Sequence, residues 1–515
     1  MKNKYAWLVV IILIIILGLF FINNKETNKE QVYVYGTAQE PGSLNPDALD
    51  EPYGFSIYQN VFNRLVKYTN SFEIVPDLAK SWEYDKTGKE LTFHLEKNVK
   101  WHDGKDFTAD DVKFTFDTII NKKGYMVGSL SNIKNIVVKD KNTITFELKE
   151  VDSSIITAFS GLGVFIMPKH IYDKTDWLDN KANKEPVGTG PFKFSNWKSG
   201  ESITLVRNDE YFGSKPKIAK AIFKFIPEEN TAWLAWKNDE IDWYDSYPAA
   251  EVSKLKKDSK YKVLDRLTAN VTYVSFNMKK KPFNDVKVRQ AFAYSVDRKE
   301  ILKTAYQNVG NISEYTIPSI FKDYTNKDAK LYSKNIDKAK ELLKEAGYKE
   351  DSKGCAVTVD FEYFSLDRNE DLAEKLKSQL KQSGICLNLK LLEYATWQEK
   401  VINNKDYTMT LMSGNQGPTI YNTINRFDPA SSINITGYNS ENIKGLIKEA
   451  KAAKDDKELK KTFNEIQKTL LNDVPILNIM EKVEYLPLKS KISGHPYDDA
   501  KKKTSPDELT YIEFK

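Results

Sequence analysis

The stretch of residues 76–114 constrains the fold of this chain more than any other. Residues 91–95 (Leu-Thr-Phe-His-Leu) alternate apolar and polar side chains, which is typical of a half-buried strand. The Asp-Gly pair at 103–104 predicts a tight turn, and Thr108 with Asp111 resembles the capping box at the start of a helix. We therefore expect a strand, a turn and a helix in that order, which is a scaffold and specifies no chemistry.

Three strings in this stretch also carry a resemblance. They are residues 76–82 (Pro-Asp-Leu-Ala-Lys-Ser-Trp), 99–104 (Val-Lys-Trp-His-Asp-Gly) and 108–114 (Thr-Ala-Asp-Asp-Val-Lys-Phe). Together they closely resemble the signature of family 5 extracellular solute-binding proteins, the peptide and nickel receptors of bacterial ABC importers. Residues 186–194 (Pro-Val-Gly-Thr-Gly-Pro-Phe-Lys-Phe) and 282–298 extend the resemblance, which covers nearly all of the chain after about Val32.

The resemblance implies an α/β, two-lobed periplasmic-binding-protein-like fold of type II, cluster C, with an extra small domain. A chain of 515 residues has room for such a division, since single cores stop growing near ~250–300 residues. The family pattern assigns residues 32–62, 186–277 and 493–515 to domain I, residues 63–185 to domain II and residues 278–492 to domain III.

Within the expected domain III, two β runs at 357–363 and 385–392 flank a helical stretch at 371–382. This order predicts a βαβ unit with parallel, adjacent strands. Cys355 and Cys386 stand at the starts of these strands, and an oxidising exterior would allow them to form a disulfide if their Cα atoms lie within ~7 Å.

The N-terminus is expected to lie outside this fold. Lys2 and Lys4 precede an apolar run from 6 to 22 that exceeds the ~7–15 residues of a signal h-region and approaches the ~17–25 of a membrane span. No small-x-small cleavage site or lipobox cysteine follows the run. We therefore expect residues 1–31 to be an uncleaved signal anchor and linker, with the rest of the chain outside the membrane at a Gram-positive cell surface. A cleaved, released form is the alternative.

Several ligand contacts are implied by the resemblance. The family segment after the first strand faces the ligand cleft, and here it contains Asp50, Glu51, Pro52 and Tyr53; without the family, these residues read as an exposed loop stiffened by proline. Tyr247 lies in a loop that borders the cleft in the family.

The segment 397–438 corresponds to the most ligand-facing region of the family. Trp397 aligns with a family tryptophan, and a strand carrying Met412 runs into Asn415 and Gln416. Peptide receptors have Gly-Trp in this loop and then an aspartate that grips the amino group of the peptide. Here Asn415 occupies the tryptophan position and Pro418 falls at or near the aspartate.

This departure leaves two readings open. Either another acid, such as Asp50 or Glu51, takes the role of the aspartate, or the ligand presents no free N-terminus. The amides of Asn415 and Gln416 still offer donors and acceptors suited to a peptide backbone.

Other classes of protein are less compatible with the sequence. The 77 basic and 72 acidic residues leave a net charge of +5 without a basic stripe, so we expect no nucleic-acid partner. None of the 4 histidines has metal-ligand spacing, and no Gly-x-Ser-x-Gly elbow occurs. We expect no metal, no cofactor and no enzyme activity, and we interpret His102 as structural.

We therefore expect a monomeric receptor that closes by hinge motion on a peptide and delivers it to a separate permease with its own ATPase subunits. Two alternatives within the family are nickel bound through a small chelator and an oligosaccharide stacked on Trp397. A cell-surface hydrolase is the third reading.

Overall fold

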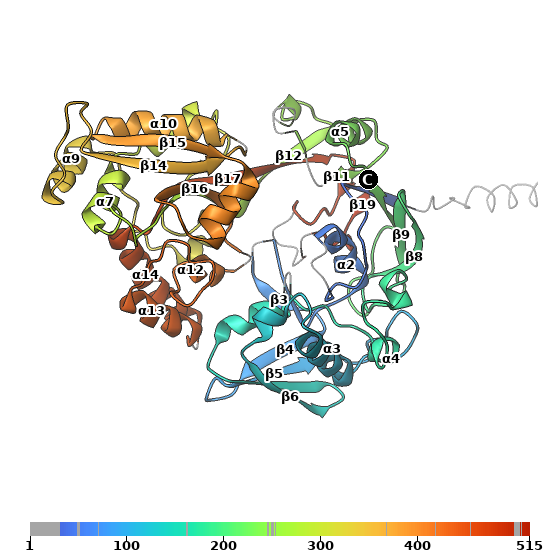
Figure 1. The fold of residues 1–515 in the computed structure, drawn as a ribbon. Coiled ribbons are helices and arrows are strands. Elements are labelled where there is room, and N and C mark those ends of the chain that lie inside the picture. Colours follow the sequence, from blue (N-terminus) through green and yellow to red (C-terminus); the bar gives the residue numbers. More distant parts are fainter. Residues whose placement is uncertain are drawn as a thin grey trace, which may run out of the picture.

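The computed structural model describes residues 31–48, 52–70, 72–160, 163–244, 247–248, 252, 254–366, 368–417, 419–453, 455–498, 505 and 507–515. Three larger sheets and two short strand pairs, β2-β3 and β18-β19, organise these residues, with helices packed on the sheets (Figure 1). Asp50, Glu51, Pro418 and the predicted N-terminal membrane helix lie outside the described residues. Within the described part of the chain, no helix combines the length and apolar character needed to cross a bilayer.

The first sheet has five strands in the order β11-β1-β10-β9-β8. Its core forms because β1 alternates, so that Tyr33 and Tyr35 point inward and are 1% exposed. The elements are β1 (Val32–Thr37), β8 (Phe192–Lys198), β9 (Ser202–Arg207), β10 (Lys220–Phe225), β11 (Trp243–Tyr244), η1 (Pro52–Gly54), α2 (Phe55–Val61), α5 (Glu229–Lys237), and the small pair β18 (Ile492–Ser493) and β19 (Glu513–Phe514).

The second sheet has the order β4-β5-β7-β6 and confirms the first prediction from the sequence. Strand β5 buries Leu91, Phe93 and Leu95 completely, and α3 begins after a capping box formed by Thr108 and Asp111. The elements are β2 (Val66–Tyr68), β3 (Ile74–Pro76), β4 (Ala79–Tyr84), β5 (Glu90–Leu95), β6 (Ile133–Asp140), β7 (Thr143–Leu148), α3 (Ala109–Lys122), α4 (Lys169–Tyr172), η2 (Val127–Leu130), η3 (Ser153–Phe159) and η4 (Lys181–Asn183).

His102 joins the turn of this second unit to the segment that returns to the first sheet. The His102 ring accepts a hydrogen bond at Nδ1 from the Gly188 N–H, 3.1 Å away, and Nε2 donates to the Gly190 carbonyl, 3.0 Å away. Gly188 is required by close approach, because a Cβ there would lie 1.8 Å from the Val61 carbonyl oxygen. Burial lowers the pKa of His102 to about 4, so the neutral ring is the folded form.

The third sheet has the order β13-β17-β12-β16-β14-β15. Strands β14 and β15 are parallel and adjacent, from Val357↔Ile385 to Phe364↔Leu392, and α10 connects them, which confirms the βαβ prediction. The elements are β12 (Tyr261–Phe276), β13 (Asn311–Ile312), β14 (Val357–Phe364), β15 (Ile385–Leu392), β16 (Met409–Asn415), β17 (Ile476–Lys489), α7 (Val286–Tyr294), α8 (Arg298–Thr304), α9 (Ile336–Glu345), α10 (Asn369–Lys381), α11 (Tyr394–Trp397), α12 (Asn422–Asn425), α13 (Glu441–Lys451), α14 (Asp456–Asp473), η5 (Ser319–Tyr324) and η6 (Gln398–Asn403).

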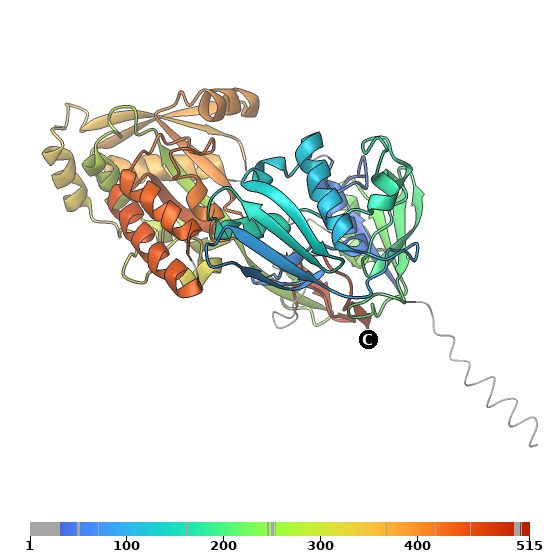
Figure 2. The ribbon, with the colours of Figure 1, turned by 90° about the horizontal axis from the view of Figure 1, so that it is seen from below.

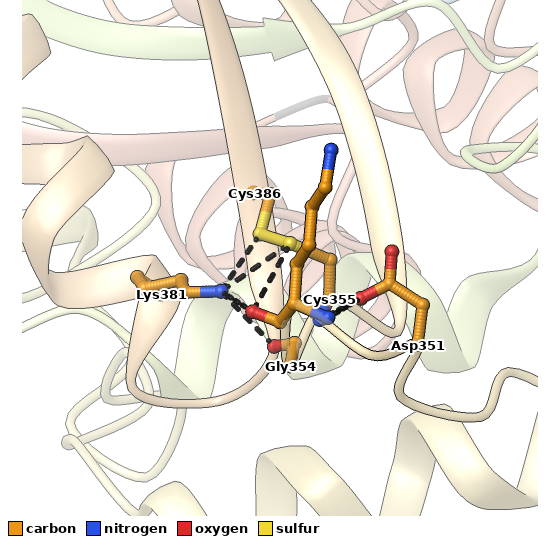
Figure 3. The surroundings of a disulfide bond; sticks show 6 residues. Asp351, Gly354, Cys355, Lys381 and Cys386 are labelled. Atoms are coloured by element: carbon orange, nitrogen blue, oxygen red, sulfur yellow. Dashed lines mark hydrogen bonds between the residues drawn. A yellow bond between two sulfur atoms is a disulfide. The ribbon is translucent and has the colours of Figure 1, made fainter.

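A disulfide between Cys355 and Cys386 closes the start of the βαβ unit, with Cα atoms 5.7 Å apart. Figure 3 shows Lys381, at the end of α10, directed at this bond: its ammonium lies 3.3 and 3.4 Å from the two sulfur atoms and donates to the Gly354 carbonyl. Asp351 accepts the Cys355 N–H on the other side. The βαβ unit is therefore tied covalently where its strands begin.

The sheets form two lobes, which we name here. Lobe one contains the five-stranded and four-stranded sheets with their helices and the segment from 492 onward, and lobe two contains the six-stranded sheet with its helices (Figure 1). The long strands β12 and β17 run between them. The predicted boundaries at 277/278 and 492/493 fall at or near the ends of β12 and β17 and stay a prediction, because each of these strands contributes to both lobes.

Candidate ligand-binding site

Strands β12 and β17 form an antiparallel ribbon whose two ends are anchored in different cores. Leu486 and Leu488 are buried in the core of the first sheet, whereas Leu477 and Ile479 are buried in the core of lobe two. The ladder is interrupted between Leu267 and Val271. A ribbon fixed at both ends and irregular in the middle is a structural basis for hinge motion between two bodies.

Side chains support the backbone at this interruption. The Thr268 hydroxyl donates to the Lys482 carbonyl, 2.8 Å away, and accepts the Asn270 N–H at 3.1 Å. Strand β16 runs beside the same part of β12, from Asn270↔Asn415 to Phe276↔Met409. The end of β16 therefore lies at the ribbon's irregular point.

Three predicted contact residues lie at or just beyond this end of β16: Met412 and Asn415 are on opposite faces of the strand, and Gln416 follows it. Met412 is half-buried and is paired with Tyr273 of β12. Asn415 is exposed, and its side-chain oxygen accepts the Gly417 N–H. Gln416 is buried, and its backbone N–H donates to the Ala269 carbonyl at 2.9 Å. A half-buried thioether and an exposed amide thus flank the ribbon.

Trp397 lies behind this group rather than on its surface. Its side chain is 5% exposed, and the indole N–H donates to the Thr410 hydroxyl at 3.0 Å. Phe364 and Tyr394 pack against the ring with centroids at 4.6 and 6.0 Å. The indole offers no open face for a sugar in this structure, although Met412 packs on the same cluster.

The other predicted contacts lie apart from β16. Tyr53 is 37% exposed in η1, which begins at Pro52. Tyr247 is half-buried in an aromatic cluster of lobe one, where its hydroxyl accepts the Tyr244 N–H at 2.9 Å and its ring lies 5.5 Å from Trp243. Tyr53 and Tyr247 belong to lobe one and are not joined to the β16 group by any contact among the described residues.

Sequence reasoning missed the pair formed by Tyr273 and Arg426. The Arg426 guanidinium lies over the Tyr273 ring, 4.9 Å from its centroid, and Nε and Nη1 are buried without a hydrogen-bond partner among the described residues. Tyr273 is the strand partner of Met412. The sequence carries no local signal for this pair, because the two residues are distant along the chain and the loop after β16 brings them together.

A second missed feature is a pocket of about 510 Å³ on the outer edge of the ribbon, beside β13 and β17. Its lining includes Tyr315, Ser319 and Glu481. Burial raises the pKa of Glu481, and its carboxylate accepts the Ser319 N–H at 3.0 Å. The pocket therefore presents an acid whose charge is only partly compensated.

The lobes, which lie side by side in Figure 2, also touch away from the ribbon. Ser153 of lobe one donates its hydroxyl to the Lys451 carbonyl at 3.0 Å and lies 2.9 Å from the Tyr421 hydroxyl. Phe72, at a left-handed φ of 61°, places its ring 5.5 Å from Phe321. These contacts are polar or aromatic, which suits surfaces that separate and meet again.

The histidines and acidic groups of the described residues form no evident metal site. No cluster of three or more histidine, cysteine or acidic side chains suitable for a metal ion is found in the described part of the chain. His495 packs against Trp243 at 4.2 Å, and burial lowers its pKa to about 3. Like His102, this histidine has a packing role.

Comparison with known proteins places the chain in a family. The model for bacterial extracellular solute-binding proteins, family 5 middle region, matches residues 73–434. The oligopeptide-binding protein AppA of Bacillus subtilis is 26% identical over 96% of this chain and 97% of its own length. The heme-binding protein A of Haemophilus influenzae is 28% identical over 91% of this chain and 90% of its own length.

A solved structure leads to the same family. The ABC transporter substrate-binding protein CtaP of Listeria monocytogenes superposes with a TM-score of 0.82 at 26% identity, covering 94% of this chain and 99% of that one. The mixed α/β architecture and the resemblance seen in the sequence are thereby confirmed. The chain belongs to family 5 of the bacterial extracellular solute-binding proteins.

Proposed function

We propose that this chain is the peptide-capturing component of an ABC importer, held at the outer surface of a Gram-positive membrane by its N-terminal segment. It acts as a monomer and passes its ligand to a permease that separate ATPase subunits drive. The fold assigned to it is the two-lobed cluster C arrangement with an extra small domain, and it carries out no reaction of its own.

One observation carries this proposal. The end of β16, with Met412 and Asn415, lies beside a ribbon that joins two separately anchored lobes. An extended ligand bound there would contact a strand end with amide donors and acceptors and a half-buried apolar side chain. Such a ligand shifts the lobes toward closure only by the difference between its affinities for the closed and open states.

The first competing ligand is nickel held by a small chelator. Family membership alone does not select peptides over other ligands, since relatives named for oligopeptide and for heme are both similar to this chain. The oligosaccharide alternative is disfavoured because Trp397 is only 5% exposed and so offers little surface for a sugar to stack on. A surface hydrolase remains the third reading and would be revealed by turnover of a peptide.

Native mass spectrometry of residues 28–515, purified without refolding, tests the proposal. A ladder of peptide masses released on denaturation is the expected result. A single non-peptide or metal-containing mass would refute the peptide assignment. Asn415→Ala is the matched variant, and Asn388→Ala on β15, whose amide donates to Asp360 at 2.9 Å within lobe two, is its control. We expect depletion of captured peptide in the first variant only.

A further inference from the structure

Arg426 lies in the part of lobe two that meets lobe one. It follows the short helix α12, and Tyr421, directly before that helix, is the residue whose hydroxyl lies 2.9 Å from Ser153 of the other lobe. On its inner side Arg426 covers Tyr273, the strand partner of Met412. The guanidinium therefore lies on the ring that is paired with Met412, and its chain segment also carries a contact with lobe one.

Two nitrogen atoms of this guanidinium are buried without a hydrogen-bond acceptor among the described residues. Nε and Nη1 are removed from solvent and have no acceptor among the described residues, and the Tyr273 ring attracts the cation without accepting a conventional hydrogen bond. Asp428 is turned elsewhere: one carboxylate oxygen accepts the Ala430 N–H at 2.9 Å and the other lies 3.9 Å from the Lys451 ammonium. Leaving buried donors unpaired is costly. A ligand that brings an acceptor to Nε and Nη1 would therefore gain binding free energy from both hydrogen bonds.

We propose that Arg426 holds a carboxylate of the ligand, an inference that rests on the proposed function. A guanidinium stays charged at every physiological pH, and its planar set of donors suits a carboxylate better than any neutral acceptor. The anchor of the ligand would then be anionic, which agrees with a sequence that has Asn415 and Pro418 where peptide receptors have tryptophan and an amino-binding aspartate. The carboxylate comes either from the peptide C-terminus or from an aspartate or glutamate side chain.

Peptide pools test this on the unaltered protein. The first pool holds tripeptides with neutral side chains as free acids, the second holds the same peptides as C-terminal amides, and the third holds amides that carry aspartate or glutamate. Isothermal titration is expected to show free acids or acidic amides binding roughly 10- to 100-fold more tightly than neutral amides. The pool that retains affinity identifies the source of the carboxylate. Equal affinity for all three pools would overturn the inference.

Variants assign the preference to one residue. Arg426→Gln is expected to bring the affinity for the favoured pool down to that for neutral amides, and Arg426→Lys to keep part of the preference. Arg207→Gln is the control, because Arg207 pairs with Asp209 on lobe one. Equal affinities of the Arg426→Gln and Arg207→Gln proteins would contradict the inference. Should Arg426→Gln fail to fold, the comparison of pools on the unaltered protein decides.

Failure of the proposed function is distinguishable from failure of this inference. Binding of peptides without any preference for a carboxylate would leave the proposed function intact and remove the role of Arg426. If no peptide binds and native mass spectrometry identifies another captured molecule, the peptide assignment fails. An anionic molecule whose capture requires Arg426 would then still support the anion site, and a neutral or cationic one would overturn it.

Discussion

The two lobes are held together in different ways. Lobe one is assembled from segments distant in the sequence: β1 pairs with β10 through Val32↔Lys220, and the Asn60 side chain accepts the Leu509 N–H at 2.9 Å. Lobe two contains a local βαβ unit whose strands are joined by a disulfide between residues 31 apart. In lobe one, a buried polar side chain joins segments that are distant in the sequence. In lobe two, a covalent bond joins two strands of one local unit.

In the proposed closure, each lobe moves as one body while the ribbon between them bends. Lobe one contains the buried His102 and the buried ion pair of Lys67 and Glu508, so acid and substitutions that remove a charge from the pair should act on it. Lobe two depends on a disulfide, so reduction should act on it. The following predictions test whether each lobe responds to its own perturbation.

The largest effect is expected from Glu508→Gln in lobe one. Burial acts to lower the pKa of Lys67, but Glu508, 2.8 Å away, more than offsets this and the pKa is raised. Removing the carboxylate leaves a buried ammonium poorly compensated, and we expect the free energy of unfolding to fall by about 3–5 kcal/mol in urea denaturation. Glu484→Gln, which breaks the half-exposed pair with Arg266, should cost at most about 1 kcal/mol. An equal loss of unfolding free energy in Glu508→Gln and Glu484→Gln would refute the expected difference between the buried and the half-exposed ion pair.

Removal of the disulfide should act on lobe two with a slightly smaller effect. A loop closed by residues 31 apart corresponds to about 3–4 kcal/mol of stabilisation in the chain-entropy model. The Cys355→Ser/Cys386→Ser variant should lose amide hydrogen-exchange protection across 355–392 while lobe one keeps its protection, and reductant should have no further effect. Loss of amide hydrogen-exchange protection in lobe one would contradict the expectation that the disulfide stabilises lobe two alone.

Acidification should destabilise lobe one first. The pKa of His102 is lowered to about 4 by burial, against an ordinary value of 6.5, so the unfolded chain binds more protons between these values. Stability is therefore fully present above pH 6.5 and is lost as the pH falls toward 4, by about 3 kcal/mol for this residue. All 4 histidines lie outside residues 278–492. Hydrogen exchange at pH 7 and pH 4.5 should show faster exchange in lobe one, and His102→Gln should weaken the pH dependence.

The smallest effect concerns the contact between the lobes. Ser153→Ala removes the hydrogen bonds to Lys451 and Tyr421, which we expect to weaken the contact by about 1 kcal/mol. Small-angle X-ray scattering of the ligand-free protein should show a larger radius of gyration, while the unfolding of each lobe stays unchanged. Ser154→Ala is the control because its hydroxyl bonds to Asp152 within lobe one. An unchanged radius in both variants would show that the contact does not restrain the lobes.

Local patterns in the sequence were sufficient for several elements. The alternation at 91–95, the capping box at Thr108 and the order of the βαβ unit each depend on neighbouring residues, and the structure has all three. The position of Met412 and Asn415 beside the ribbon also follows from their place on one strand, which Gln416 directly follows.

The remaining features depend on contacts between distant segments. Trp397 is covered because α11 packs on Phe364 at the end of β14, and Arg426 meets Tyr273 because the loop after β16 folds over β12. No periodicity in the sequence encodes either event. Family resemblance supplied Trp397 as a contact, and only the fold shows that its indole N–H is already bonded to Thr410.

The most direct test of the account is the size of the protein with and without its own ligand. Material released by denaturation of the natively purified protein is added back to ligand-free protein, and scattering is recorded at rising concentration, with occupancy followed by native mass spectrometry. The account predicts that the radius of gyration falls in proportion to occupancy as the lobes close about β12 and β17. Full occupancy with an unchanged radius would contradict closure of the lobes on the ligand.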